Sequence, residues 1–151
     1  FRHGFYLTRR VPKPDNYFTE YILIISPSRG LCRITAKSED IKTNPSGAQL
    51  RNAFEEARNR LEKKYGNGES VDRLKPGSMC YNPDEFMICL AKKHRILAAV
   101  WSAPTESAES DDVEQISLRA LSYSSRFDVG YITLNYKFSD SESCMDEIGF
   151  R

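Results

Sequence analysis

The stretch from residue 113 to residue 138, VEQISLRALSYSSRFDVGYITLNYKF, contains two alternating segments separated by a turn. The apolar positions are Ile116, Leu118 and Ala120 in residues 113–123, and Ile132, Leu134, Tyr136 and Phe138 in residues 131–138. Side chains two apart along a strand share a face, so each segment predicts a strand with one apolar side. Residues 124–130 are expected to join the two strands as a hairpin loop.

Four further segments are rich in the β-branched and aromatic residues that favour strands. They are residues 5–11 (FYLTRRV), 17–26 (YFTEYILIIS), 31–37 (LCRITAK) and 95–102 (RILAAVWS). The second is apolar on both faces, which is typical of a central strand. Residues 27–30 (PSRG) predict a hairpin turn into the third strand, because Gly30 can adopt positive φ. In that third strand Cys32 alternates in step with Ile34 and Ala36, so we expect Cys32 to point inward.

Residues 47–65 carry the clearest helical pattern. Ser46 and Gln49 fit a capping box, in which the two side chains satisfy backbone donors of the first turn. One apolar stripe then follows the 3.6-residue period, and Gly66 closes the helix. The stripe consists of Leu50, Phe54, Ala57, Leu61 and Tyr65. These features predict a helix that covers a sheet.

A second helix is expected to begin at Asn82, because Asn82-Pro83-Asp84-Glu85 combines a cap residue, proline at the first position and acids in the first turn. Residues 67–79 are interpreted as a polar loop, and residues 140–148 as a last helical turn that carries Cys144. Strands in consecutive runs with short turns predict an antiparallel sheet. We therefore expect residues 1–151 to form a single α+β domain, with two layers: a mainly antiparallel sheet of about six strands and two helices packed on one face.

The composition is ordinary for a soluble globular protein, with 40% hydrophobic and 28% charged residues and a formal net charge of +1. No apolar run approaches the roughly 18 residues that a transmembrane helix requires, so we expect no membrane span. The sequence begins at Phe1, without an initiator methionine, which a removed signal peptide would explain.

Four cysteines, Cys32, Cys80, Cys89 and Cys144, are spaced too widely for a zinc framework, and the two histidines do not complete one. We therefore expect no metal site. Cys32 has two readings: a buried free thiol, which we favour, and a disulfide, for which Cys144 is the expected partner. An even cysteine count permits disulfides, and this favours an exported, periplasmic location over the cytoplasm.

The residues that could support catalysis do not form a recognisable motif. No nucleophile elbow, metalloprotease pair or phosphate-binding loop is present, and we expect no cofactor. His94 lies among lysines and an arginine at the end of a predicted helix, where cations complete the helix dipole. A small hydrolase-like enzyme with an unfamiliar site is the alternative hypothesis, and its candidates are Cys80, His94 and the Asp84-Glu85 pair.

Two features suggest contacts with another protein. Residues 103–112, APTESAESDD, form an acidic segment with Glu106, Glu109, Asp111 and Asp112. If the sheet face opposite the helices is uncovered, Arg119 and Tyr131 would lie on a polar and aromatic surface of the kind found at protein interfaces. Such a face could also stack nucleic-acid bases, but the glycine-aromatic pattern of RNA-recognition sheets is missing, so nucleic acid is the weaker hypothesis.

Three stretches together resemble a family of small bacterial domains of unknown function, often exported. They are GLCRITA (residues 30–36), SGAQLRNAFEEARNRLEKKYG (46–66), and DEFMICLAKKHRILAAVW (84–101), followed by residues 116–138 and Cys144. The family's pattern is a G-L-C-x-I strand, a helix ending in L-x-x-K-Y-G and a helix-strand unit ending near a tryptophan. The resemblance covers about residues 17–145 and implies a bacterial origin and an α+β fold, but no catalytic residue.

We therefore hypothesise a non-enzymatic bacterial binding protein, of the immunity, inhibitor or accessory type, that acts through contacts with another protein. The oligomeric state is left open by the sequence.

Overall fold

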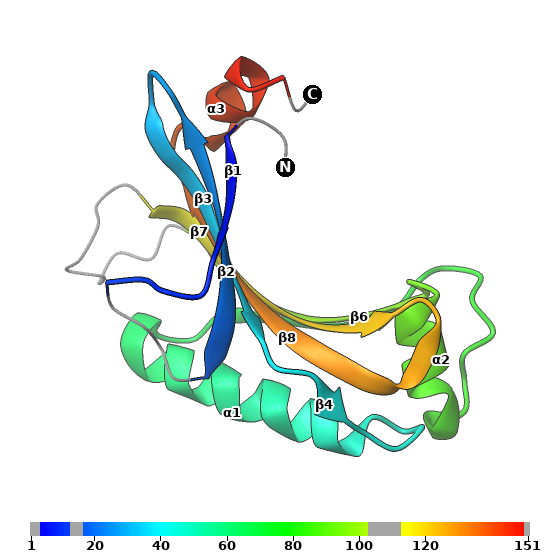
Figure 1. Ribbon diagram of the computed structural model, residues 1–151. Helices are drawn as coiled ribbons and strands as arrows, with labels where there is room; N and C mark the ends of the chain where they lie inside the picture. Colours follow the sequence, from blue (N-terminus) through cyan, green and yellow to red (C-terminus); the bar gives the residue numbers. More distant parts are fainter. Residues whose placement is uncertain (1–3, 13–16, 103–112, 150–151) are drawn as a thin grey trace.

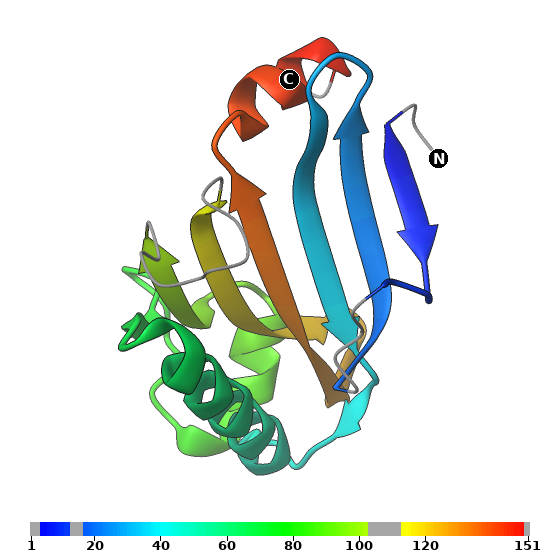
Figure 2. The same ribbon diagram turned by 90° about the vertical axis from the view of Figure 1, so that its left-hand side faces the viewer.

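The computed structural model describes residues 4–12, 17–102 and 113–149. Its strands are β1 (Phe5–Thr8), β2 (Phe18–Ser26), β3 (Gly30–Ser38), β4 (Ile41–Lys42), β5 (Glu69–Leu74), β6 (Arg95–Ser102), β7 (Val113–Tyr123) and β8 (Arg126–Phe138). Its helices are α1 (Ala48–Tyr65), a 3₁₀ turn η1 (Pro83–Glu85), α2 (Phe86–Ala91) and α3 (Ser141–Glu147). The described strands form one antiparallel sheet in the order β1-β2-β3-β8-β7-β6-β5, and β4 also pairs with β8 (Figures 1 and 2).

The predicted hairpin of residues 113–138 supplies two adjacent inner strands of this sheet. Leu118 stands opposite Leu134, and Ala120 stands opposite Ile132. All four side chains are buried in the main core, as the alternation predicts. The turn is shorter than expected, because β8 begins at Arg126 and leaves only residues 124 and 125 between the strands.

Helix α1 packs on the apolar face of this hairpin and confirms the predicted helix to within one residue. Its buried side chains are Leu50, Phe54 and Ala57, the first three members of the predicted stripe. The helix start differs from the expected capping box: the Oδ1 atom of Asn44 accepts the backbone N–H of Ala48 at 3.0 Å. Capping thus comes from the loop before the helix.

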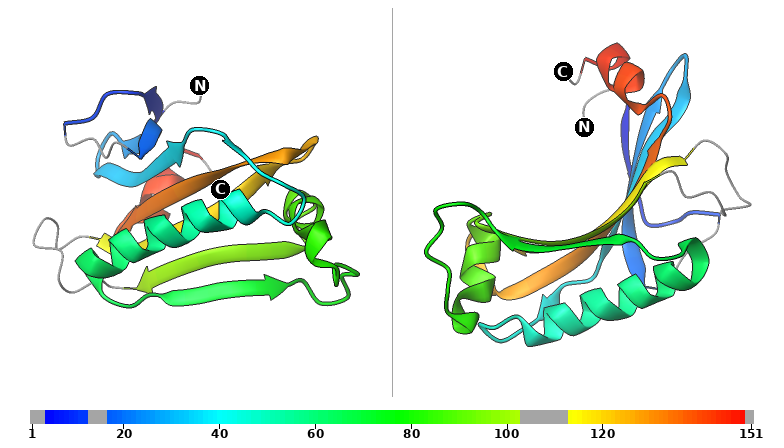
Figure 3. Two further views of the ribbon diagram at one scale, coloured as in Figure 1. Left: turned by 90° about the horizontal axis from the view of Figure 1, so that it is seen from below. Right: turned by 180° about the vertical axis from the view of Figure 1, so that it is seen from behind.

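Helix α2 is short but almost entirely buried, and it extends the core at one end of the sheet. The Oδ1 atom of Asn82 accepts the backbone N–H of Asp84 at 3.0 Å, which confirms the predicted cap. Phe86, Met87 and Leu90 join the core cluster that α1 covers. Figures 1 and 3 show α1 and α2 against the same face of the sheet.

Helix α3 packs on the opposite face, at the other end of the sheet (Figures 1 and 3). A second, small core cluster joins Ile24 and Cys32 to Cys144 and Met145 of this helix. The register between β2 and β3 passes from Ile24↔Arg33 to Ile25↔Leu31, which leaves Cys32 in a β-bulge. Cys32 is therefore buried, but in the α3 cluster, whereas Ile34 and Ala36 contact the main core.

The carboxylate of Glu147 also fastens α3 to the turn between β2 and β3. It accepts hydrogen bonds from the hydroxyl of Ser26 and, at 2.7 Å, from the hydroxyl of Ser28. These hydrogen bonds favour the charged carboxylate and lower the pKa of Glu147. Acid that protonates Glu147 therefore weakens this attachment.

The α+β class and the antiparallel sheet are confirmed, but the described sheet has eight strands, three helices pack on it, and one of those helices lies on the second face. The longest strand that the sequence does not predict is β5, which lies within the segment interpreted as a polar loop. β5 is an edge strand paired only with β6, so it buries little apolar surface and lacks a strand-like apolar pattern.

No described helix is long and apolar enough to cross a bilayer.

The four cysteines lie in two pairs at disulfide distance. The Cα atoms of Cys32 and Cys144 are 6.0 Å apart, and those of Cys80 and Cys89 are 6.2 Å apart. Of the two readings of Cys32, this geometry favours the disulfide over the free thiol. It also pairs Cys80 with Cys89, which the sequence does not indicate.

Gly130 of β8 provides a test of the packing between α1 and the sheet. A Cβ atom at this position would lie 2.5 Å from Cδ2 of Leu50 and 2.9 Å from the carbonyl oxygen of Leu121. We expect Gly130→Ala to lower the free energy of unfolding by about 1–3 kcal/mol, measured by denaturant titration. In a Leu50→Ala background the same substitution should cost clearly less, because the opposing methyl groups are gone. Equal costs in both backgrounds would contradict the proposed contact.

The two disulfides should differ in their contribution to stability, because their sequence separations are 112 and 9 residues. In the chain-entropy model the longer loop contributes about 4–5 kcal/mol and the shorter one about 2–3 kcal/mol. We therefore expect the Cys32→Ser/Cys144→Ser pair to destabilise more than the Cys80→Ser/Cys89→Ser pair, by denaturant titration. A thiol assay of the denatured, unreduced wild type should find no reactive thiol; four reactive thiols would contradict both bridges.

Candidate functional site

The face of β3, β8 and β7 that points away from α1 and α2 is the candidate functional surface, called the open face below. Among the described elements only α3 packs on this side of the sheet, at one end (Figures 1 and 3). Across the three strands Lys37, Thr133 and Arg119 form one row, because Thr133 is the register partner of both. All three side chains therefore project from paired β-strands rather than from loops.

A cluster of two tyrosines, one lysine and one aspartate lies where β3 ends. The rings of Tyr123 and Tyr131 have centroids 4.9 Å apart and are tilted by 42°. The Nζ atom of Lys37 lies 4.8 Å from the Tyr131 ring centroid and 5.8 Å from that of Tyr123. The Tyr123 hydroxyl donates a 2.6 Å hydrogen bond to Asp40, which also lies 3.8 Å from Lys37 Nζ.

These contacts change the protonation of the cluster. Burial, followed by the hydrogen bond to the Asp40 carboxylate, raises the pKa of Tyr123. Burial alone lowers the pKa of Lys37, but its contacts with Tyr123 and Asp40 outweigh burial and raise the pKa. Both groups therefore keep their protons at neutral pH, and the cluster presents a cation beside two neutral phenol rings.

Arg119 and Tyr131, the two predicted contact residues that the structure describes, lie close together on this face. Arg119 stands opposite Thr133, and Tyr131 is two residues before Thr133 on β8, so the two side chains are diagonal neighbours. Arg119 is exposed and Tyr131 is half-buried. The sequence did not single out Lys37 or Asp40, although the alternation of residues 31–37 places Lys37 on the outward side of its strand.

The open face carries more positive than negative charge. Its cations on the three strands are Arg33, Lys37, Arg119 and Lys137. Two described carboxylates near Lys37 each have a cation beside them: Asp40 lies 3.8 Å from Lys37, and Glu20, the register partner of Lys37 on β2, is 3.3 Å from Arg9. An approaching acidic group therefore meets a net positive surface.

The predicted acidic contact residues, Glu106, Glu109, Asp111 and Asp112, lie outside the described residues. The described ends of that segment, Ser102 and Val113, stand at the end of β6 and β7 opposite to Tyr123. The structure thus brings Arg119 and Tyr131 together, and the acidic segment lies outside the residues that it describes.

Within the described part of the chain, the structure brings together two of the candidates for the enzyme hypothesis, Cys80 and Glu85. Cys80 and Cys89, with Glu85, form the single three-residue group whose potential metal-ligand atoms lie within 4.8 Å of one another. Both sulfurs belong to the disulfide, so neither provides the thiolate that a nucleophile or a metal requires. Asp84 is exposed in the first turn before α2, and His94 follows α2 in a turn.

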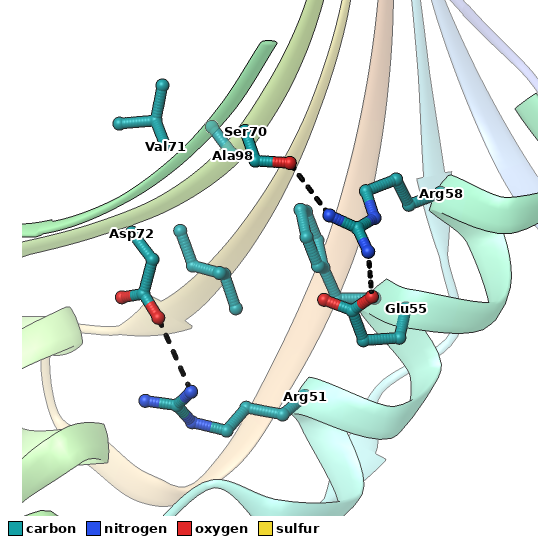
Figure 4. A pocket seen from close by; sticks show the side chains of 9 residues that line it. Arg51, Glu55, Arg58, Ser70, Val71, Asp72 and Ala98 are labelled. Atoms are coloured by element: carbon teal, nitrogen blue, oxygen red, sulfur yellow. Dashed lines mark hydrogen bonds and ion pairs between the residues drawn. The ribbon is translucent and has the colours of Figure 1, made fainter. Parts of the chain in front are cut away.

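A cavity of about 290 Å³ lies between α1 and the edge strand β5 (Figure 4). Most of its polar lining is paired: Arg58 donates to Ser70 at 2.7 Å and lies 2.6 Å from Glu55, and Arg51 lies 3.5 Å from Asp72. The buried Nε atom of Arg58 makes no hydrogen bond and lies 3.8 Å from Glu62. These pairs connect the helix to the edge strand. The two arginines and the two carboxylates that line the cavity balance in charge, so we interpret it as part of the packing between α1 and β5.

A scan against protein-family models, a search of curated proteins and a search of solved structures each returned no match. The resemblance to small bacterial domains therefore stays an expectation.

The pKa of Tyr123 tests the geometry of the tyrosine cluster. We expect it to titrate above the ordinary value of 10.0. Asp40→Asn should lower this pKa, because it removes the negative charge that favours the protonated phenol, and Lys37→Met should raise it. NMR of ring-labelled tyrosine would follow each titration. Glu39→Gln, a neighbouring exposed carboxylate, serves as the matched control; equal shifts in the Glu39 and Asp40 variants would rule out the specific hydrogen bond.

Proposed function

We propose that this chain is a non-enzymatic binding protein that recognises another protein through the open face. The observation that carries the proposal is the juxtaposition of Arg119 with the Tyr123–Tyr131 pair on adjacent strands. Tyrosine and arginine are enriched among the residues that dominate binding energy at protein interfaces.

The rigidity of the surface supports affinity. Tyr131, Lys37 and Arg119 all project from strands, and the ring contacts and the Tyr123–Asp40 hydrogen bond hold the tyrosines in place. A side chain that is already ordered loses little conformational entropy when a partner binds. The open face therefore resembles a preorganised interface rather than a flexible one.

The charge of the surface indicates the character of the partner. The four cations on the central strands favour a partner with an acidic patch. Attraction between the two oppositely charged surfaces would increase the association rate at low ionic strength. Two disulfide pairs support the proposal that the domain works in an oxidising, exported compartment of a bacterium. An immunity, inhibitor or accessory protein of that compartment fits both features.

Nucleic acid is the second candidate, since a positive face with two tyrosines is also suited to stacking bases on aromatic rings. The two candidates differ in their dependence on salt. For a single-stranded oligonucleotide, the logarithm of the association constant would fall steeply and linearly with the logarithm of the salt concentration. The number of phosphates that the protein neutralises would set the slope.

An Arg119→Ala/Tyr131→Ala double variant tests the proposal. A partner captured by the tagged wild type from a bacterial extracytoplasmic extract would be purified and its affinity measured by calorimetry. We expect the double variant to weaken binding by at least about tenfold. The matched control, Lys63→Ala/Tyr6→Ala, removes exposed side chains outside the open face and should bind as the wild type does.

A partner that binds the double variant as tightly as the wild type would disprove the role of the open face. Oligonucleotide anisotropy at several salt concentrations, with the same variants, decides between a protein partner and nucleic acid.

A further inference from the structure

Cys80, Glu85 and Cys89 form a cluster of three potential metal ligands at the end of the sheet beside α2. The Sγ atoms of the two cysteines and a carboxylate oxygen of Glu85 all lie within 4.8 Å of one another. Figures 1 and 3 show α2 and the loop before it, residues 75–82, at one end of the molecule. Zinc binds both thiolates and carboxylates in proteins. The donor types and their proximity thus fit a zinc site once both sulfurs are thiolates.

The local fold explains why these three side chains meet. Glu85 is the last residue of η1, directly before α2, and Cys89 follows it four positions later. Side chains four positions apart lie on the same side of a helix, one turn from each other. Cys80 reaches them from the loop that precedes η1, and the Asn82 cap fixes where that loop ends. The start of the helix therefore supplies two ligands, and the loop supplies the third.

The rest of the structure does not explain the carboxylate of Glu85. The residue is half-buried, and its carboxylate forms no hydrogen bond or ion pair with another described residue. A carboxylate that is partly removed from water costs free energy unless a cation or a hydrogen-bond donor lies beside it. The neighbouring disulfide is neutral and provides neither. A metal cation bound to Glu85 and to the two sulfurs would remove this cost.

The Cys80–Cys89 disulfide closes the cluster in the oxidised chain, and it is the more accessible of the two bridges. Cys80 is half-buried on its loop, whereas Cys32 and Cys144 are only 2% and 1% exposed. A thiolate breaks a disulfide by attacking one of its sulfurs, so reduction depends on access to that sulfur. A reductant therefore reaches the Cys80–Cys89 bond first, through Cys80.

We propose that Cys80, Glu85 and Cys89 form a redox-gated zinc site, which the disulfide closes and a dithiol reductant opens. One thiolate of the dithiol attacks Sγ of Cys80, the bond to Cys89 breaks, and Cys89 leaves as a thiolate. The second thiolate of the dithiol then attacks its own partner sulfur in the mixed disulfide and releases Cys80 as a thiolate. The dithiol loses two electrons and becomes a disulfide, and its two protons pass to water. Zn²⁺ then binds the two cysteine thiolates and Glu85.

The cluster can adopt the geometry of a zinc site with a local change. In a tetrahedral site with Zn–S bonds of about 2.3 Å, two sulfur ligands lie about 3.8 Å apart. The Cα atoms of Cys80 and Cys89 are 6.2 Å apart, so rotation of the Cys80 side chain on its loop can provide this separation. Three protein ligands leave the fourth position to water. The site uses none of the strands of the open face and does not rest on the proposed function.

Partial reduction of the full chain tests the gate. Dithiothreitol is added under argon until two thiols per chain appear, and it is then removed. Alkylation and mass spectrometry should locate both thiols at Cys80 and Cys89, with Cys32 and Cys144 still bridged. Circular dichroism verifies that the partly reduced chain remains folded.

A Co²⁺ titration of the partly reduced chain tests the metal site, because Co²⁺ adopts the tetrahedral geometry of zinc and absorbs light intensely when thiolates bind it. We expect one ion per chain with thiolate-to-cobalt absorption, and Zn²⁺ should displace this ion. The oxidised chain should show no such absorption, since its sulfurs are bonded to each other.

Glu85→Gln should raise the dissociation constant for Co²⁺ at least about tenfold. Residues that only support a metal ligand already contribute about 10–100-fold to affinity, so loss of a direct ligand should cost at least as much. The matched control is Asp84→Asn, because Asp84 is the neighbouring carboxylate, is exposed and lies outside the cluster. This variant should bind Co²⁺ as the wild type does.

Co²⁺ bound without thiolate absorption, or bound equally tightly by the oxidised chain, would overturn the proposal. So would partial reduction that exposes Cys32 and Cys144 first. A folded Glu85→Gln variant that binds Co²⁺ as tightly as the Asp84→Asn control would also overturn it.

Discussion

The contact between Leu50 of α1 and Gly130 of β8 is the constraint on which the arrangement of the layers depends. The Leu50 methyl groups occupy the space that a side chain at position 130 would fill. The helix can therefore approach the sheet closely enough for Phe54 and Ala57 to reach the strands. Interiors are packed as densely as organic crystals, so a shift of the helix at this point would open space along its whole buried stripe.

Because α1 covers one face of the sheet, the same alternation determines which side chains lie on the other face. Alternation sends Leu118 and Leu134 toward α1, and consequently sends Arg119 and Asn135 to the opposite side. Helix α3 covers only one end of that side, where Cys32 is paired with Cys144. The open face is thus a direct result of the same pattern that builds the core.

Much of this architecture could be predicted from local sequence, because periodicity reports which side of an element is buried. The stripe from Leu50 to Ala57 and the alternation around Leu118 are examples. Features that depend on pairing across the chain could not be predicted. β5 forms because β6 offers it an edge, the bulge at Cys32 moves that side chain into the α3 cluster, and Asn44 replaces Ser46 as the cap.

The candidate site illustrates the same limit. Arg119 and Tyr131 could be recognised as outward residues on two strands, but their proximity depends on the register of β7 and β8. Asp40 meets Tyr123 across 83 positions of sequence, and no local pattern connects them. Long-range hydrogen bonds of this kind have no periodic signature, since they depend on where a strand ends rather than on how it alternates.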